Sequence, residues 1–249
     1  MDLKLPLIQP EWPAPAAVRA CVTTRVGGVS LAPYDGLNLG DHVGDAVDAV
    51  IENRARLRAW LPAEPLWLSQ VHGVAVADAD RVDGELPPEA DAAVARQPGN
   101  VCAVLTADCL PVLFCDEAGT VVAAAHAGWR GLLEGVLEAT VTRMAVPPKT
   151  LLAWMGPAIG PQAFEVGDEV RAAFVAEDPA AASGFEPGRQ AGKWMADLFL
   201  LARLRLERVG VTRIHGGGVC THRASEQFYS YRRDGRTGRF VSLIWITRE

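Results

Sequence analysis

Residues 106–131, TADCLPVLFCDEAGTVVAAAHAGWRG, contain the pattern around which the rest of the chain is organised. Two apolar runs flank the turn-forming residues 116–119, which predicts a buried β-hairpin followed by the start of a helix. Cys109 lies at the boundary of the first strand, and His126 ends the second. These are not the positions where a plain core places a thiol and an imidazole, so the hairpin indicates a metal site or a nucleophile.

Composition excludes several classes of protein. The chain has 249 residues, 49% of them hydrophobic, and a net charge of −6. That charge argues against a nucleic-acid or anionic-membrane surface, and the apolar runs are too short to span a bilayer. The five cysteines are an odd and sparse set, which fits free thiols in a reducing compartment. Because the opening residues are too polar and proline-rich for a secretion signal, we expect a cytoplasmic protein.

Strand and helix patterns alternate around the hairpin. We expect strands at residues 17–24, 66–69, 92–95, 101–106, 151–155, 212–215 and 240–247. We expect helices between the N-cap Asp45 and Pro62, and at residues 131–144, 167–176 and 193–209. Residues 177–192 are rich in alanine, glycine and proline, but a helical pattern follows at once, so they predict an insertion. The pattern predicts an α/β (α+β) fold with mixed sheets, in a single domain over residues 1–249.

His72, Cys109 and His126 share a setting, because each lies at the end of an apolar strand and near a small residue. Two imidazoles and a thiolate suit a borderline-soft cation, zinc first and copper second. Three protein ligands leave a fourth position open, as in catalytic zinc sites. Their spacing matches no CxxC or HExxH motif, and Cys109 with His126 as its base fits a nucleophile equally well. An ordinary buried thiol and two core histidines are the simplest alternative.

Arginines mark candidate anion sites. Arg130 follows Trp129 at a strand-to-helix junction, where free N–H groups and the helix dipole favour anions. Arg25, beside two glycines, and the pair Arg232-Arg233 are further candidates, although a surface salt bridge is the simpler interpretation of Arg233. Four aromatic residues can stack on a planar base, although core packing is the commoner role: Trp129, Phe228, Tyr229 and Tyr231.

Seven motifs, in chain order, together resemble the YfiH-like laccase-domain family across nearly the whole chain. They are TTRVGGVS, LNLGDHVGD, QVHG, TADCLPVLF, AAAHAGWRG, GPAIGPQAFEVGDEV and SYRRDGRTGRF. This family was first labelled multicopper polyphenol oxidase and later assigned as zinc-dependent purine nucleoside phosphorylases. The resemblance implies that His72, Cys109 and His126 are the metal ligands, holding zinc or copper. It also implies an αββα-type sandwich similar to the cytotoxic necrotising factor deamidases.

The implied reaction is phosphorolysis of adenosine, inosine and 5′-methylthioadenosine to free base and ribose 1-phosphate, with adenosine deamination as a second activity. The resemblance places Arg25, Asn38, Arg130 and Arg232 in the substrate site. We expect Cys109, His126 and Asp108 to be catalytic, with Asp108, His42 and Glu165 as the candidates for the general acid or base. Purine nucleosides and phosphate are the expected partners, and the expected assembly is a monomer or small homo-oligomer.

Two other functions stay open. The first is a copper-dependent polyphenol oxidase. A multicopper laccase needs paired His-x-His segments, and none of the five histidines forms such a pair, so a true laccase is disfavoured. Oxidation of phenols by copper in the zinc site is still compatible with the sequence. The second is a cysteine amidase or peptidoglycan-precursor editing hydrolase with Cys109 as its nucleophile.

Overall fold

The structure is a computed structural model that describes residues 5–81 and 86–248. In chain order, its strands are β1 (Val18–Val22), β2 (Pro65–Leu66), β3 (Val76–Asp78), β4 (Ala92–Ala95), β5 (Val101–Thr106), β6 (Leu110–Asp116), β7 (Val122–Ala127), β8 (Leu151–Met155), β9 (Glu165–Gly167), β10 (Phe185–Pro187), β11 (Lys193–Ala196), β12 (Arg213–Gly216) and β13 (Phe240–Ile246). The helices are α1 (Val47–Arg58), α2 (Trp129–Glu134), α3 (Val136–Met144), α4 (Asp168–Glu177), α5 (Leu198–Arg208) and α6 (Tyr231–Asp234), with short 3-10 helices η1 (Pro148–Thr150) and η2 (Pro179–Gly184).

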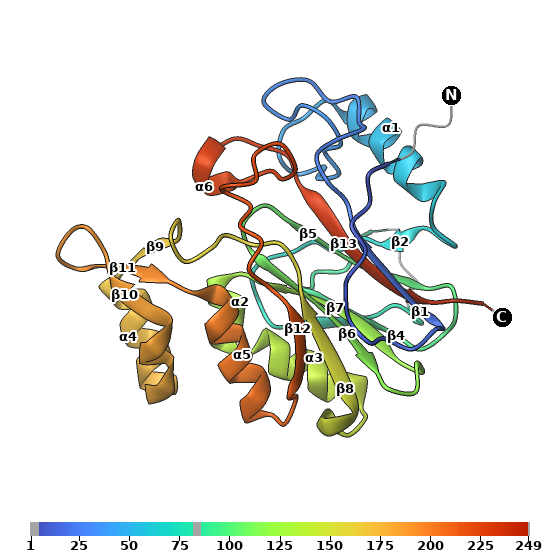
Figure 1. Ribbon diagram of the computed structural model, residues 1–249. Coiled ribbons are helices and arrows are strands. Elements are labelled where there is room, and N and C mark those ends of the chain that lie inside the picture. Colours follow the sequence, from blue (N-terminus) through green and yellow to red (C-terminus); the bar gives the residue numbers. More distant parts are fainter. Residues whose placement is uncertain (1–4, 82–85, 249) are drawn as a thin grey trace.

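Two large sheets pack face to face. One has the order β12-β8-β6-β7-β4-β3 and the other β1-β13-β5-β2. Apolar side chains from both sheets, including Leu113, Ala124 and Phe240, fill the space between them. Helices α3 and α5 cover the outer face of the six-stranded sheet, and α1 covers that of the four-stranded sheet (Figure 1). This layer order confirms the predicted αββα-type sandwich with mixed sheets, while the likeness to the necrotising factor deamidases stays a prediction.

The predicted hairpin is the central pair of the six-stranded sheet. Strands β6 and β7 pair antiparallel from Leu110 opposite Ala127 to Cys115 opposite Val122. Every residue of both strands is buried, because sheet neighbours lie on both sides and packed layers cover both faces. The open end of this hairpin therefore brings Cys109 and His126 close together at the edge of the core.

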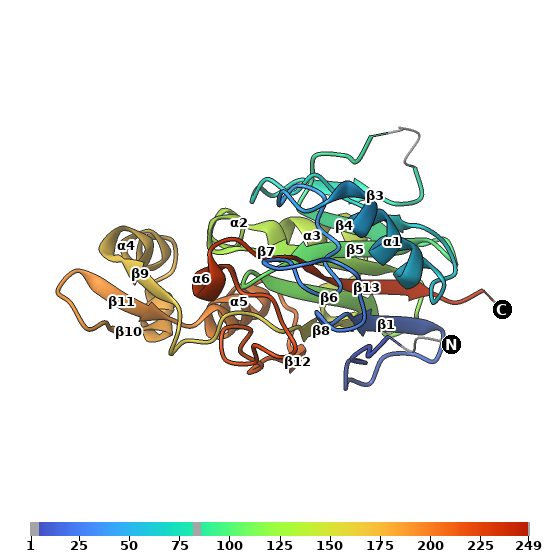
Figure 2. The same cartoon turned by 90° about the horizontal axis from the view of Figure 1, so that it is seen from above.

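A third, smaller sheet extends from the sandwich. Strands β10, β11 and β9 pair antiparallel in that order, and α4 packs beside them. Figures 1 and 2 show this unit at one end of the molecule in both views. The predicted insertion at residues 177–192 lies here and contains η2 and β10. Among the described residues, no helix is long and apolar enough to cross a membrane.

Two helix predictions were wrong in their bounds. Residues 131–144 do not form one helix, because Gly135, with φ 101°, takes a left-handed conformation that ends α2 and starts α3. Residues 193–209 begin as strand β11, and α5 starts only after Asp197. The Asp197 carboxylate accepts hydrogen bonds from the backbone N–H groups of Phe199 and Leu200 and so marks the true N-cap.

The predicted N-cap Asp45 was also wrong, because Ala46 precedes α1. The Asp45 carboxylate instead accepts hydrogen bonds from the Ser30 hydroxyl (2.6 Å) and the Asn38 side chain (2.8 Å). Its carboxylate therefore ties together the polar loop at residues 25–44, and tertiary contacts override the local capping signal.

Candidate metal centre

The structure brings the predicted triad together from three separate segments. His72 follows β2 in a loop, Cys109 immediately precedes β6, and His126 is near the end of β7. Their ligand atoms all lie within 4.8 Å of one another. The Cys109 Sγ atom is 3.7 Å from His72 Nε2. The centroids of the His72 and His126 rings are 4.7 Å apart, and the rings meet edge to face.

This donor set fits a tetrahedral metal ion. With the bond lengths usual for zinc, a thiolate sulfur and an imidazole nitrogen on one ion lie about 3.6 Å apart, which matches the observed 3.7 Å. His126 is 3% exposed, Cys109 is half-buried and His72 is exposed, so the group opens to solvent on one side. Zinc and copper both accept two imidazoles and one thiolate, with a fourth position left for substrate or water.

The backbone at the site is shaped for close approach. His72 and Asp108 have φ values of 63° and 96°, a left-handed conformation that non-glycine residues seldom adopt. A Cβ atom at Gly128 would lie 2.7 Å from the His72 ring and 3.0 Å from Cys109 Sγ. A side chain at this position would crowd the side chains of His72 and Cys109, so the close packing of the triad favours glycine here.

Asp91 is a site residue that the sequence patterns did not reveal. It is fully buried immediately before β4, and its carboxylate lies 2.8 Å from His126 Nδ1. The same carboxylate accepts backbone hydrogen bonds from Val71, His72 and Gly73. Burial opposes its ionisation, but the hydrogen bonds from His126 and the backbone outweigh burial and lower the pKa of Asp91. The sequence signal that could have revealed Asp91 is its position directly before the apolar strand at residues 92–95.

The surroundings of the triad favour the charged forms of both Cys109 and His126. Burial disfavours the thiolate, yet the charge and hydrogen bonds of His126 and His72 lower the pKa of Cys109. Burial likewise disfavours the imidazolium, but the Cys109 thiolate and Asp91 raise the pKa of His126. These opposite shifts favour a thiolate–imidazolium pair of Cys109 and His126, and the thiolate is the form that binds a metal.

A cavity of about 490 Å³ opens beside the triad. Its lining residues from the described parts of the chain are His42, Gln70, His72, Leu105, Thr106, Ala107, Asp108, Cys109, His126, Trp129, Arg130, Ile159, Phe164, Tyr231, Arg232 and Arg239. Three arginines are among them, and none has a carboxylate partner within residues 5–81 and 86–248. Asp108 and Cys109 also line the cavity and act on Arg239 through their charge, but none of the three guanidinium groups is in direct contact with a described carboxylate. Three such guanidinium groups in one cavity favour the binding of an anion.

Residues 19–247 match the model of the family described as multi-copper polyphenol oxidoreductase laccase. The chain belongs to this family. It is 60% identical to a Pseudomonas aeruginosa protein named purine nucleoside phosphorylase, over 96% of this chain and 98% of that one. It is 57% identical to Escherichia coli purine nucleoside phosphorylase YfiH, again over 96% and 98%. The resemblance to the YfiH-like laccase-domain family is thus confirmed.

Solved structures of the family share the fold. A Neisseria meningitidis DUF152 protein superposes with a TM-score of 0.92 at 51% identity, covering 97% of this chain and 99% of that one. YlmD from Geobacillus stearothermophilus gives a TM-score of 0.87 at 31% identity, covering 98% and 100%.

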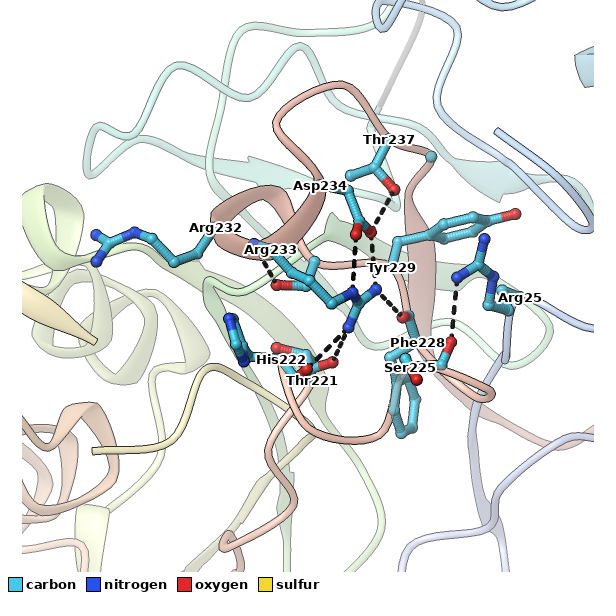
Figure 3. Close-up of polar contacts among 12 residues, drawn as sticks. Arg25, Thr221, His222, Ser225, Phe228, Tyr229, Arg232, Arg233, Asp234 and Thr237 are labelled. Carbon is cyan, nitrogen blue, oxygen red and sulfur yellow. Dashed lines mark hydrogen bonds and ion pairs between the residues drawn. The ribbon is translucent and has the colours of Figure 1, made fainter. Parts of the chain in front are cut away.

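Two expected substrate residues lie away from the cavity in the described structure. Arg25 donates to the Ser225 carbonyl, as Figure 3 shows. It also pairs with Asp35 at 2.9 Å and lies over the Tyr229 ring. Asn38 is fully buried, and its side-chain oxygen accepts the backbone N–H of Arg239 at 2.8 Å. Asn38 therefore reaches the cavity indirectly, through the backbone of an arginine that lines it.

Asp108 does line the cavity, but its carboxylate is already engaged. One oxygen accepts the Thr221 hydroxyl at 2.6 Å, and the other accepts the Ser230 hydroxyl at 3.0 Å and the Arg232 backbone N–H at 2.6 Å. These bonds hold the segment before β13 against the site. The catalytic role expected for Asp108 stays a prediction.

Adjacent arginines take opposite roles. Arg233 donates to the carbonyls of Thr221, His222 and Phe228 and pairs with Asp234 at 2.7 Å, so the predicted salt bridge is confirmed. The Arg232 side chain extends away from that cluster, as Figure 3 shows. It lines the cavity, lies over the Phe164 ring and donates to the Glu165 carbonyl at 2.8 Å.

Arg239 was missed, although it stands in the quoted motif SYRRDGRTGRF. It lines the cavity from just before β13, and burial lowers its pKa. Of the four candidate stacking residues, Phe228 and Tyr229 are fully buried core residues. Trp129 and Tyr231 line the cavity, and Tyr231 is 61% exposed there.

Proposed function

We propose that the chain is a purine nucleoside phosphorylase acting on adenosine, inosine and 5′-methylthioadenosine. The observation that carries this proposal is a set of three arginines that have no carboxylate partner among the described residues. Arg130, Arg232 and Arg239 line one cavity with the His/Cys/His group. Oxidation of a phenol does not call for cations, but binding of a phosphate dianion does. The names of the two bacterial relatives support the same reaction.

In phosphorolysis, an oxygen of phosphate forms a bond to C1′ of the ribose while the bond from C1′ to the purine nitrogen breaks. The bonding electron pair leaves with the purine, which takes up a proton, and positive charge develops on the sugar. The arginines hold phosphate against C1′, because guanidinium forks bind its oxygens in fixed directions. Trp129 and Tyr231 supply aromatic faces at the cavity for the purine.

His42 is the proposed proton donor to the departing base. It lines the cavity, and its imidazole can exchange a proton with bound substrate. Burial and the charge of Arg239 lower the pKa of His42, so the neutral ring is favoured and would relay a proton to the base. Asp108 also lines the cavity, but both of its oxygens accept hydrogen bonds from the protein. Glu165 is not among the lining residues within the described ranges, and its carbonyl is occupied by Arg232.

The second proposed activity is hydrolysis of adenosine to inosine and ammonia at the same site, with zinc as the metal and copper as the second choice. A metal held by His72, Cys109 and His126 would supply a Lewis acid that lowers the pKa of water. The chain's own contribution is to place the purine against that group, with Trp129 and Tyr231 beside it. The five cysteines are all free thiols, which supports a cytoplasmic enzyme.

A cysteine amidase is the second candidate function, and one observation favours it. Asp91, His126 and Cys109 form a chain of contacts in which an oriented imidazole adjoins a thiolate, as in cysteine hydrolases. This alternative needs no metal. The two functions therefore differ in whether a chelator or a thiol reagent stops the reaction.

The test is chromatography of adenosine, inosine and 5′-methylthioadenosine after incubation with purified protein of known metal content, each with and without phosphate. We expect free base and sugar 1-phosphate only when phosphate is present, and inosine from adenosine in either case. Absence of base release from all three nucleosides contradicts the phosphorylase. Amide hydrolysis that survives a chelator but not iodoacetamide would establish the amidase instead.

A further inference from the structure

Asp91 touches two of the three metal ligands, although it comes from a different segment than either. It precedes β4, which pairs with β7 so that Ala92 lies opposite Ala125. This register places Asp91 beside His126, whose backbone N–H donates to the Asp91 carbonyl at 2.7 Å. Its side chain then reaches both the His126 ring and the loop that carries His72.

The two carboxylate oxygens divide four hydrogen bonds between them. Oδ1 accepts from His126 Nδ1 (2.8 Å) and from the His72 backbone N–H (2.9 Å). Oδ2 accepts from the N–H groups of Gly73 (2.7 Å) and Val71 (3.2 Å). Three consecutive N–H groups therefore converge on one carboxylate, which compensates the unfavourable left-handed conformation of His72.

The same contact selects the form of His126 that can bind a metal. When Nδ1–H donates to the carboxylate, the free electron pair of the neutral ring is on Nε2, which faces the triad. We propose that Asp91 is the positioning residue of the metal centre, one carboxylate that fixes the His126 tautomer and the His72 loop together. This inference rests on the metal-dependent function proposed above and concerns how that metal is held.

Asparagine at position 91 tests the idea because it has the same shape but only one acceptor oxygen. If its NH2 group replaces Oδ1, it faces two donors, the His126 ring and the His72 N–H. If it replaces Oδ2, it faces the N–H groups of Val71 and Gly73. Either orientation breaks two of the four hydrogen bonds, so no rotation of the side chain restores the site.

Asp116 is a control for Asp91, because it is a buried aspartate at the turn end of the β6–β7 hairpin, whereas Asp91 adjoins the open end of that hairpin. Asp116 is 4% exposed, and its carboxylate accepts the Val121 N–H (3.0 Å), the Thr120 N–H (2.6 Å) and the Thr120 hydroxyl (2.8 Å). Asp116→Asn therefore also exchanges a buried carboxylate for an amide. Its oxygen can accept both N–H groups and its NH2 group can donate to the Thr120 hydroxyl, so the variant removes the charge and keeps the turn. It does so without touching any of the three metal ligands.

The experiment measures zinc affinity of the full chain by competition with a chromophoric chelator, and the melting temperature with and without zinc. We expect Asp91→Asn to lower zinc affinity by about 10–100-fold and to reduce the zinc-dependent rise in melting temperature. We expect the zinc affinity of Asp116→Asn to stay within about threefold of wild type, since no ligand contact changes. Equal zinc affinities for the two variants overturn the proposal.

A measurement on the wild-type chain covers the case in which Asp91→Asn does not fold. In the zinc-loaded protein, nitrogen-15 NMR of the histidine rings is expected to show His126 bound through Nε2, with a protonated Nδ1. Binding through Nδ1, or a proton on Nε2, contradicts the positioning role. Neither readout involves nucleoside turnover, so a protein that shows both results but cleaves no nucleoside refutes the proposed function and leaves this inference intact.

Discussion

A buried aspartate carboxylate lies at each end of the β6–β7 hairpin, and the two find their hydrogen-bond partners in different ways. At the turn end, Asp116 accepts hydrogen bonds from Thr120 and Val121, four and five residues along the chain. At the open end, Asp91 accepts hydrogen bonds from the loop around His72 and from His126. His126 is 35 residues from Asp91 in the sequence. A buried carboxylate that is satisfied locally builds a turn. One that is satisfied by distant segments aligns functional groups.

The same contrast holds for the two cysteines of this hairpin. Cys109 at the open end is half-buried beside two histidines, and its pKa is lowered. Cys115 lies near the turn end of β6, fully buried, and desolvation raises its pKa to about 12. Both belong to one apolar strand pattern, so their difference in chemistry comes from their neighbours. The groups that could hold a metal are thus concentrated at one end of an otherwise apolar hairpin.

The strongest test of this contrast removes a ligand from the open end. His126→Ala is expected to lower zinc affinity by more than about 100-fold, because loss of a direct ligand exceeds the 10–100-fold effect of an outer partner. Turnover of nucleosides should fall with it. Metal analysis after gel filtration measures the first effect, and chromatography of the products measures the second. Retention of one zinc per chain by this variant would show that His126 is not a ligand.

The thiols allow a pH test in chelator-treated protein. The pKa of Cys109 is lowered from 9.0 to about 6, so its thiolate persists down to about pH 6 and is lost as the pH falls below that value. Alkylation by iodoacetamide should therefore proceed nearly as fast at pH 7 as at pH 8.5. An unshifted thiol would react about 20-fold more slowly at pH 7, in proportion to its thiolate fraction.

Peptide mass spectrometry identifies the alkylated cysteine. Cys115 is expected to stay unlabelled in the folded chain at both pH values, and zinc should protect Cys109. A rate at Cys109 that drops about 20-fold between pH 8.5 and pH 7 contradicts the thiolate–imidazolium pair.

The phosphate site is tested by the adjacent arginines. Arg232→Ala should raise the KM for phosphate by about tenfold, since it removes one charge-assisted hydrogen bond, and leave the melting temperature close to wild type. Arg233→Ala should do the opposite, because it removes three carbonyl contacts and a salt bridge. Initial rates at varied phosphate, together with thermal unfolding, separate the two. An unchanged KM in Arg232→Ala excludes this residue from phosphate binding.

The smallest expected effect is at the turn end. Thr120→Val removes the 2.8 Å hydrogen bond from the threonine hydroxyl to Asp116. It should lower the free energy of unfolding by about 0.5–1.5 kcal/mol, the usual contribution of one hydrogen bond. Urea denaturation measures this change, and zinc affinity is the control. A loss of zinc affinity here would mean that the two ends of the hairpin are coupled after all.

Much of the fold follows from local patterns. The hairpin and the strand at residues 151–155 were predicted, because their apolar runs are long. His72, Cys109 and His126 were singled out because they interrupt apolar runs, and the structure brings them together, while their role as metal ligands stays a prediction from the family resemblance. The break at Gly135 and strand β11 were not, since each depends on a neighbour: a left-handed glycine between two packed helices, and a pairing with β9. Helix and strand propensities of single residues are a weak guide where tertiary contacts decide the secondary structure.

In the candidate site, too, some features follow from the local sequence and others only from tertiary contacts. By itself, the sequence determined the hairpin, the donor atoms and their kinship with a family, because residue types and apolar periodicity are properties of the chain. The tertiary structure alone decided which polar groups serve them. It buried Asp91 between two ligands, directed Arg232 to the cavity and Arg233 away from it, and kept Arg25 outside. Hydrogen bonds between segments distant in sequence leave no periodic trace, and they are what turns two histidines and a cysteine into one site.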